Sequence, residues 1–203
     1  MKAVGFNTSD YPLCEYLLVL SPHEDLQDKI LKVKDEFYKS YNVTASFGFG
    51  SKPHITLMRF NTWERMEEKI VNCLKMIAMG TLAFKVALKD YGSFPSHTIY
   101  INVTTKIPIN NLIVRLREVK KSMKSPNPAP HFITDHYIPV ARNLLPWQYE
   151  KGWLEYSHRH FTASFIADGM FVLKRREGEK GYQIVQHLKF MNLSVGTKQG
   201  MLF

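Results

Sequence analysis

The sequence predicts an α+β fold, formed as one domain of two similar lobes. The first observation is that the order strand, helix, strand, helix, strand occurs twice along the 203 residues. The second is the composition, with 45% hydrophobic and 22% charged residues, which is that of an ordinary globular chain large enough to bury a core. The sequence also contains no linker or low-complexity stretch. We therefore expect residues 1–203 to form a single two-lobed domain with an internal repeat over about 15–80 and 98–158.

The first half begins with a strand and a capped helix. Residues 16–20 are a continuous apolar run, which is typical of a buried strand. Residues 21–24, Ser-Pro-His-Glu, form an N-terminal capping pattern, and apolar residues at helical spacing predict a helix over about 22–40. Alternating polar and apolar residues predict a strand over 54–59. Residues 61–80 then repeat the capping pattern and the helical spacing, and a glycine ends this second helix.

The second half is predicted by the same signals, with turn residues and prolines between the elements. In order, the elements are strands over 82–89 and 98–104 with a turn-rich loop over 91–97, a helix over about 108–123, a strand over 131–140, a helix over about 146–156, and strands over 160–174 and 181–190 joined by a charged turn.

The strand over 54–59 holds the residues with functional chemistry. Side chains two apart on a strand share a face, so His54 and Thr56 project together while Ile55 and Leu57 point into a core. Histidine exchanges a proton near neutral pH, and a threonine hydroxyl donates to a phosphate oxygen. This pair is one half of an acid/base phosphate site.

A fixed spacing relates the two halves. Tyr16 precedes His54 by 38 residues, and Ile99 precedes Tyr137 by the same number. Superposing the halves on this spacing sets Ile-Thr-Leu-Met-Arg of the first half against Ile-Pro-Val-Ala-Arg of the second. The apolar positions and the arginine are kept. Tyr137 stands at the position of the histidine, and Pro139 stands at the position of the threonine.

A chain of this size with two α+β halves and His54-Ile55-Thr56 at the start of a strand resembles the two-histidine phosphoesterases. Within them it is most similar to the bacterial 2′-5′ RNA ligase and RNA 2′,3′-cyclic phosphodiesterase branch, over residues from Tyr16 to about Phe190. The resemblance implies two lobes, each an antiparallel sheet with packed helices, around a central cleft. It also implies one histidine as general base and one as general acid, threonines on the phosphate oxygens, and no metal or other cofactor.

The resemblance implies catalytic roles for His54 and Thr56. In the second half only Arg142 matches the pattern, and Arg59 is its counterpart in the first half, so we expect both arginines to bind substrate. Tyr137 takes the place of the second catalytic histidine. A phenol has a reference pKa near 10, so Tyr137 is suited to donating a proton rather than accepting one.

Three other histidines leave alternatives open. His136 is adjacent to Tyr137, and a bulge near Pro139 would turn its side chain toward the site, where it would replace the missing second histidine or bind substrate. His97 enters the second-half strand and is a further candidate for substrate binding. His160 begins a literal His-x-Thr match, but its place in the chain does not fit the repeat.

The remaining expectations come from charge and composition. The net charge of +9 favours an anionic partner, which we expect to be RNA or a small phosphorylated nucleotide. Two cysteines and scattered histidines do not form a spaced metal motif. The absence of a membrane span or signal peptide predicts a soluble, cytoplasmic protein. The sequence does not fix its oligomeric state, for which a monomer is favoured. The predicted function is a weak, metal-independent phosphodiesterase or 2′-5′ RNA ligase-like enzyme acting on 2′,5′ or 2′,3′-cyclic phosphodiesters, and the alternative is an inactive RNA- or nucleotide-binding module.

Overall fold

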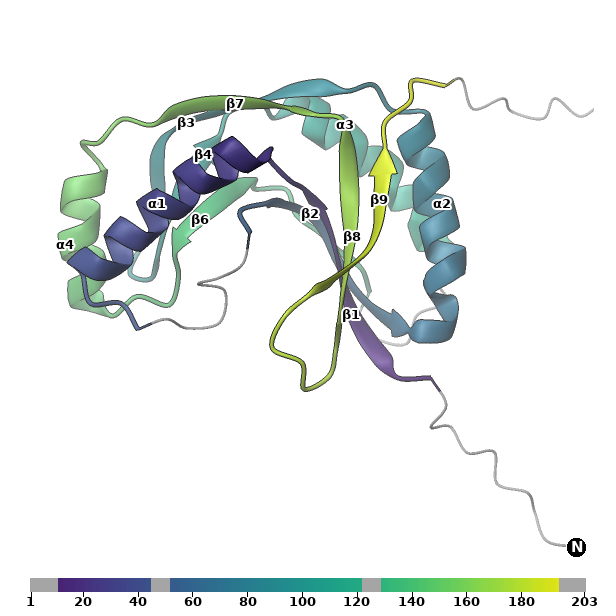
Figure 1. Ribbon diagram of the computed structural model, residues 1–203, viewed down its shortest axis with the longest axis horizontal. Helices are drawn as coiled ribbons and strands as arrows, with labels where there is room; N and C mark the ends of the chain where they lie inside the picture. The colour runs from purple at the N-terminus through teal and green to yellow at the C-terminus, as the bar shows by residue number, and fades with distance from the viewer. Residues whose placement is uncertain (1–10, 45–51, 122–128, 194–203) are drawn as a thin grey trace, which may run out of the picture.

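The computed structural model describes residues 11–44, 52–121 and 129–193, which form two antiparallel β-sheets and four α-helices (Figure 1). The predicted α+β fold is therefore confirmed. Sheet A has the strand order β5-β2-β1-β8-β9, and sheet B has the order β6-β4-β3-β7. The strands of sheet A are β1 (Leu13–Leu20), β2 (Ile55–Trp63), β5 (His131–Phe132), β8 (Gly169–Arg176) and β9 (Gln183–Lys189). Those of sheet B are β3 (Phe84–Phe94), β4 (Thr98–Val103), β6 (Tyr137–Ala141) and β7 (Thr162–Ala167).

Two helices cover each sheet, and two of the four cross between the lobes. The helices are α1 (Glu24–Ser40), α2 (Glu67–Met79), α3 (Ile107–Leu116) and α4 (Pro146–Tyr156), with short 3-10 turns η1 (Glu64–Met66) and η2 (Arg117–Lys121). Sheet A carries α2 and α3, whereas sheet B carries α1 and α4, and Figure 1 shows the two pairs on opposite sides of the molecule. Helix α1 follows β1 of sheet A but packs against β6 of sheet B, and α3 follows β4 of sheet B but packs against β2 of sheet A. These crossings tie the two lobes together.

The alternation along β1 separates a core face from an open face. Cys14, Tyr16 and Leu18 are buried beneath the helices, while Glu15 and Leu17 between them are half-buried on the other face. An antiparallel sheet with helices on one face leaves the other face available to a ligand. The open face of sheet A therefore includes the side chains that lie opposite Glu15 and Leu17 on neighbouring strands.

A β-bulge lies next to the predicted half-site in β2. The register with β1 shifts between Leu18 and Val19, which makes Leu57 the extra residue. Ile55 and Leu57 are fully buried, which confirms the inward direction predicted for these two side chains. Thr56 lies opposite Val19 and is half-buried.

A second bulge lies in β6. Its register with β4 shifts between Ile99 and Tyr100, which makes Val140 the extra residue. The alignment of the two halves sets Val140 against Leu57, so the bulges occupy aligned positions. Leu18 and Ile99 occupy the same place relative to the two bulges, so Ile99 corresponds to Leu18. The 38-residue spacing aligns Ile99 with Tyr16, two residues earlier.

Two segments that were each predicted as one strand form two strands in different sheets. The run 131–140 contains β5 of sheet A and β6 of sheet B, and the run 160–174 contains β7 of sheet B and β8 of sheet A. The alternation of apolar and polar residues indicates which face of a strand is buried but not which sheet the strand belongs to. It therefore cannot predict where the chain crosses from one sheet to the other. The second crossing is at Gly169, where an added Cβ would lie 2.6 Å from Nε2 of His187.

Other boundaries also differ from the prediction. Helix α1 begins after His23 rather than Ser21, because the Ser21 hydroxyl accepts a hydrogen bond from Gln27 Nε2 at 3.0 Å. β3 extends through most of the predicted loop, to Phe94. The predicted helix over 108–123 ends as an α-helix at Leu116, and its last two positions lie outside the described residues. No helix in the described ranges is long and apolar enough to cross a membrane.

Candidate active site

His54 immediately precedes β2, and its imidazole is oriented by the backbone. Its Nδ1 lies 2.8 Å from the carbonyl oxygen of Lys52. A carbonyl only accepts hydrogen bonds, so Nδ1 carries the hydrogen and the neutral ring keeps its lone pair on Nε2. His54 is half-buried. This arrangement presents Nε2 as a proton acceptor, which is the tautomer that a general base requires.

The surroundings of His54 favour its neutral form. Burial is the largest cause that lowers the pKa of His54 below its ordinary value, and the hydrogen bond to the Lys52 carbonyl opposes this effect. The positive charges of Arg142 and Lys34 lower the pKa further. Arg142 directly follows β6 of sheet B, and Lys34 belongs to α1, which packs on the same strand. Charged side chains from α1 and from the end of β6 are therefore close enough to His54 to influence its pKa.

Lys34 is the site residue that sequence reasoning missed. Its side chain is only 6% exposed, and burial followed by the charge of Arg142 lowers its pKa. Ile30 and Phe37, which are fully buried on the same face of α1, lie four residues before and three residues after it. The sequence signal that could have identified Lys34 is its position as a single lysine on the apolar face of a predicted helix. Arg142 and Lys34 both bring positive charge near this imidazole, which suits a phosphate.

Tyr137 and Arg142 form the sheet B side of the site. Arg142 Nη2 lies 3.5 Å from the Tyr137 hydroxyl, and the guanidinium lies over the tyrosine ring, 5.6 Å from its centroid. The Tyr137 ring also packs against Phe94 and Tyr100, with centroid distances of 5.1 and 4.8 Å. These contacts fix the direction of the phenol on the open face of sheet B.

Thr56 and Pro139 occupy aligned places in the two lobes. Thr56 lies opposite Val19 in sheet A, and Pro139 lies opposite Tyr100 in sheet B, each one residue before a bulge. The threonine supplies a hydroxyl donor, whereas the proline supplies none. Of these two aligned positions, only position 56 carries a hydroxyl.

His136 lies between the two lobes. Burial lowers its pKa most, while Asp135 and the backbone carbonyl of Thr56 raise it. Its Nε2 lies 3.4 Å from Oδ1 of Asn110 in α3, and its Nδ1 is buried with no hydrogen-bond partner among the described residues. The imidazole is therefore directed at the backbone of β2 and at α3 rather than at His54.

The other two candidate histidines, His160 and His97, both lie at the ends of strands of sheet B. His160 precedes β7, and its side chain is 91% exposed. Its Nδ1 lies 3.3 Å from Oδ1 of Asp90. Since β6 and β7 are opposite edges of sheet B, three strand spacings, or about 14 Å, separate them. His97 lies at the hairpin between β3 and β4, where its Nδ1 is 2.6 Å from the Thr98 hydroxyl.

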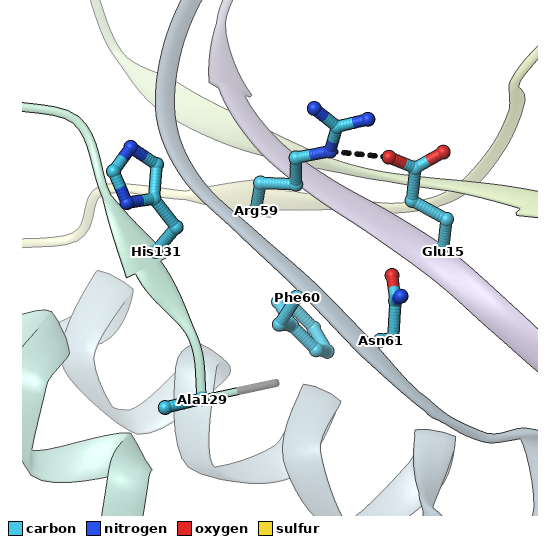
Figure 2. Close-up of a pocket in the computed structure, with 6 residues that line it drawn as sticks. All are labelled: Glu15, Arg59, Phe60, Asn61, Ala129 and His131. Atoms are coloured by element: carbon cyan, nitrogen blue, oxygen red, sulfur yellow. Dashed lines mark hydrogen bonds and ion pairs between the residues drawn. The ribbon is translucent and has the colours of Figure 1, made fainter. Parts of the chain in front are cut away.

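Arg59 lies further along the open face of sheet A, where its Nε donates to Glu15. Both residues line a cavity at the edge of this sheet (Figure 2). Among the residues that the structure describes, no three histidine, cysteine, aspartate or glutamate side chains gather in a way that could hold a metal ion.

Comparison with known proteins identifies relatives of this chain. The sequence profile of the 2′-5′ RNA ligase superfamily matches residues 24–179. No curated protein matches significantly. Among solved structures, E. coli LigT in its apo form superposes with a TM-score of 0.62 at 11% identity, covering 88% of this chain and 98% of LigT. E. coli LigT complexed with 3′-AMP gives a TM-score of 0.59 at 12% identity, with 89% and 99% covered. A Thermus thermophilus protein gives 0.55 at 13% identity, with 87% and 98% covered.

Proposed function

The chain belongs to the 2′-5′ RNA ligase superfamily, and from this premise we propose that it binds 2′,5′-linked or 2′,3′-cyclic phosphodiesters of RNA or small nucleotides and hydrolyses them slowly, without a metal. The observation that carries the proposal is His54, whose Nδ1 is held by Lys52 so that Nε2 is left as a base beside Arg142 and Lys34. That E. coli LigT has been crystallised with 3′-AMP, ATP, NADP+ and phosphate supports a phosphorylated ligand for this fold.

Each residue has a role in the proposed reaction. His54 Nε2 accepts a proton from the attacking water as its oxygen bonds to phosphorus. Arg142 and the Thr56 hydroxyl hold the phosphate oxygens, on which negative charge gathers in the transition state. The bond from phosphorus to one ribose oxygen breaks, and that oxygen takes a proton from the Tyr137 hydroxyl. The products are a phosphomonoester and a free ribose hydroxyl, with His54 protonated and Tyr137 left as a phenolate. Proton exchange with solvent then returns both side chains to their starting forms.

The slow rate follows from the second lobe. A phenol is a weaker acid than an imidazolium by about 3.5 units of reference pKa, and Pro139 has no hydroxyl to offer. The specific observation of Tyr137 and Pro139 at the aligned positions also favours the second candidate function, a module that binds the same ligands without turnover. The two candidates share a binding site and differ only in the fate of the ligand.

Binding and hydrolysis of 2′,3′-cyclic AMP test the proposal. We expect weak binding by calorimetry and slow product formation by ³¹P NMR. His54→Ala should lower the rate by about 10²–10⁴-fold while binding persists. His160→Ala is the matched control, since His160 is exposed on the far edge of sheet B, and it should change neither quantity. Binding without any product would select the binding module, and loss of hydrolysis in the His160 variant alone would refute the site.

A further inference from the structure

A cavity of about 430 Å³ lies beside the proposed site, at the edge of sheet A, and the proposed function makes no use of it. It is lined by residues of β1, β2, β5 and the segment that leads into β5, and Figure 2 shows them: Glu15, Arg59, Phe60, Asn61, Ala129 and His131. The volume lies within the range of small-ligand sites and is large enough for a phosphate with its sugar.

Arg59 is oriented in this cavity by a hydrogen bond to Glu15. Its Nε donates to Glu15, and Figure 2 shows the two terminal guanidinium nitrogens at the outer end of the side chain. The Arg59 side chain is 57% exposed, whereas that of Glu15 is 15% exposed. Solvent and ligands therefore reach the terminal N–H groups, while the carboxylate that orients them is mostly covered.

The charge of Glu15 is already offset. Burial by itself would raise the pKa of Glu15, but hydrogen bonds from Tyr182, Arg175 and Arg59 lower it overall. Arg175 Nε lies 3.1 Å from the Glu15 carboxylate. Two arginines against one carboxylate leave a net positive charge, so an incoming anion meets a positive potential at this cavity.

His131 provides a second donor on the opposite wall. It pairs with Arg59 across the β2–β5 ladder, so the two side chains leave the same face of the sheet with their Cβ atoms about 5 Å apart. The His131 side chain is exposed. An arginine fork and an imidazole N–H at this separation can bind one phosphate from two sides.

The spacing between this cavity and the catalytic residues matches one step along a nucleic-acid strand. Thr56 lies opposite Val19 and Arg59 lies opposite Leu17, and these two residues of β1, being two apart on a strand, point to the same side of the sheet. Two residues along an antiparallel strand span about 6.8 Å, since the bulge absorbs the additional residue of β2. Neighbouring phosphates in an extended strand are separated by a similar distance.

We propose that the cavity of Arg59 and His131 binds the phosphate one nucleotide away from the phosphate held at His54 and Thr56. The substrate is then the end of an RNA strand that carries a 2′,3′-cyclic phosphate or a 2′,5′ linkage, in preference to a mononucleotide. This inference rests on the proposed function, because it takes the reacting phosphate to lie at His54.

Two probes separate the sites: 2′,3′-cyclic AMP, which has one phosphate, and the adenosine dinucleotide with a terminal 2′,3′-cyclic phosphate, which has a second one nucleotide away. We expect the wild-type protein to bind the dinucleotide roughly tenfold more tightly. Arg59→Met should remove most of this difference and His131→Asn should remove part of it. Arg65→Met is the matched control, because Arg65 is an exposed arginine of the same lobe that lies in η1, outside the cavity.

Salt dependence adds a second readout. The slope of log K against log salt should be steeper by about 0.7 for the dinucleotide than for the mononucleotide, and Arg59→Met should abolish that difference. Equal affinities of the wild-type protein for the two ligands, or equal losses in the Arg59 variant, would overturn the second phosphate site and leave the proposed function standing. Failure of both ligands to bind would overturn both. Thermal unfolding of each variant verifies that it is folded.

Discussion

Restoring the second His-x-Thr motif should convert this protein into a faster phosphodiesterase. The change is Tyr137→His together with Pro139→Thr. Position 139 belongs to β6, the edge strand of sheet B, and lies opposite Tyr100 of β4. A β-branched threonine suits a strand better than proline does. The histidine gives up ring contacts with Phe94 and Tyr100 at about 5 Å, a loss of about 1 kcal/mol in stability that the fold can tolerate.

The expected gain can be worked out from the two missing groups. Replacing a phenol by an imidazolium improves the acid by about 3.5 units of reference pKa, which corresponds to roughly 10²-fold in rate for a Brønsted coefficient near one half. A threonine hydroxyl adds one hydrogen bond to a charged phosphate, about 1.5–3 kcal/mol, or roughly 10–10²-fold if it acts in the transition state. Together they predict an increase of roughly 10³–10⁴-fold.

The assay is hydrolysis of 2′,3′-cyclic AMP at pH 7, measured for the wild-type protein, both single variants and the double variant. The gain of the double variant should be close to the product of the two single gains, and the four rates together measure the coupling between positions 137 and 139. Adding His54→Ala to the double variant should return the rate to the wild-type level or below. A folded double variant that binds the nucleotide normally and is no faster than wild type would refute the assignment of positions 137 and 139.

Two further predictions concern charge and packing. Lys34→Met should raise the pKa of His54, measured by NMR titration, because one of the cations that disfavours the imidazolium is removed, whereas Lys32→Met on the exposed side of α1 should leave it unchanged. Gly152→Ala should lower the melting temperature by roughly 2–6 °C, since the new Cβ would lie 2.7 Å from the buried ring of Phe37 and overpacking of about 1–3 kcal/mol exceeds the gain in helix propensity of about 1 kcal/mol. An unchanged His54 titration, or a more stable Gly152 variant, would contradict the described packing of α1.

Local signals in the sequence are enough for most of the fold. The fourth helix was predicted over 146–156, its observed span, because a proline opens it and apolar residues follow at helical spacing. The strand over 131–140 was divided instead between sheets A and B, with Ile133 N still bonded to the Leu57 carbonyl oxygen before the chain crosses. Side-chain alternation depends on burial alone, so it cannot reveal which strand is the partner.

The candidate site was predictable only in part, for a related reason. His54 and Thr56 were identifiable because the motif, the strand period and the preceding elements agree. Lys34 was not, because its role depends on α1 crossing from sheet A to pack against β6 of sheet B. Arg59 was expected to bind substrate, but its bond to Glu15 and its cavity depend on the pairing of three strands.

The most direct test of the central claim is the NMR spectrum of the His54 ring nitrogens during titration with 2′,3′-cyclic AMP. The Lys52 carbonyl at 2.8 Å predicts the tautomer with hydrogen on Nδ1, and the Nε2 resonance should shift as the nucleotide binds while that of His160 stays fixed. A ring protonated on Nε2, or a nucleotide that shifts His160 and leaves His54 unmoved, would contradict a phosphodiester site built on His54.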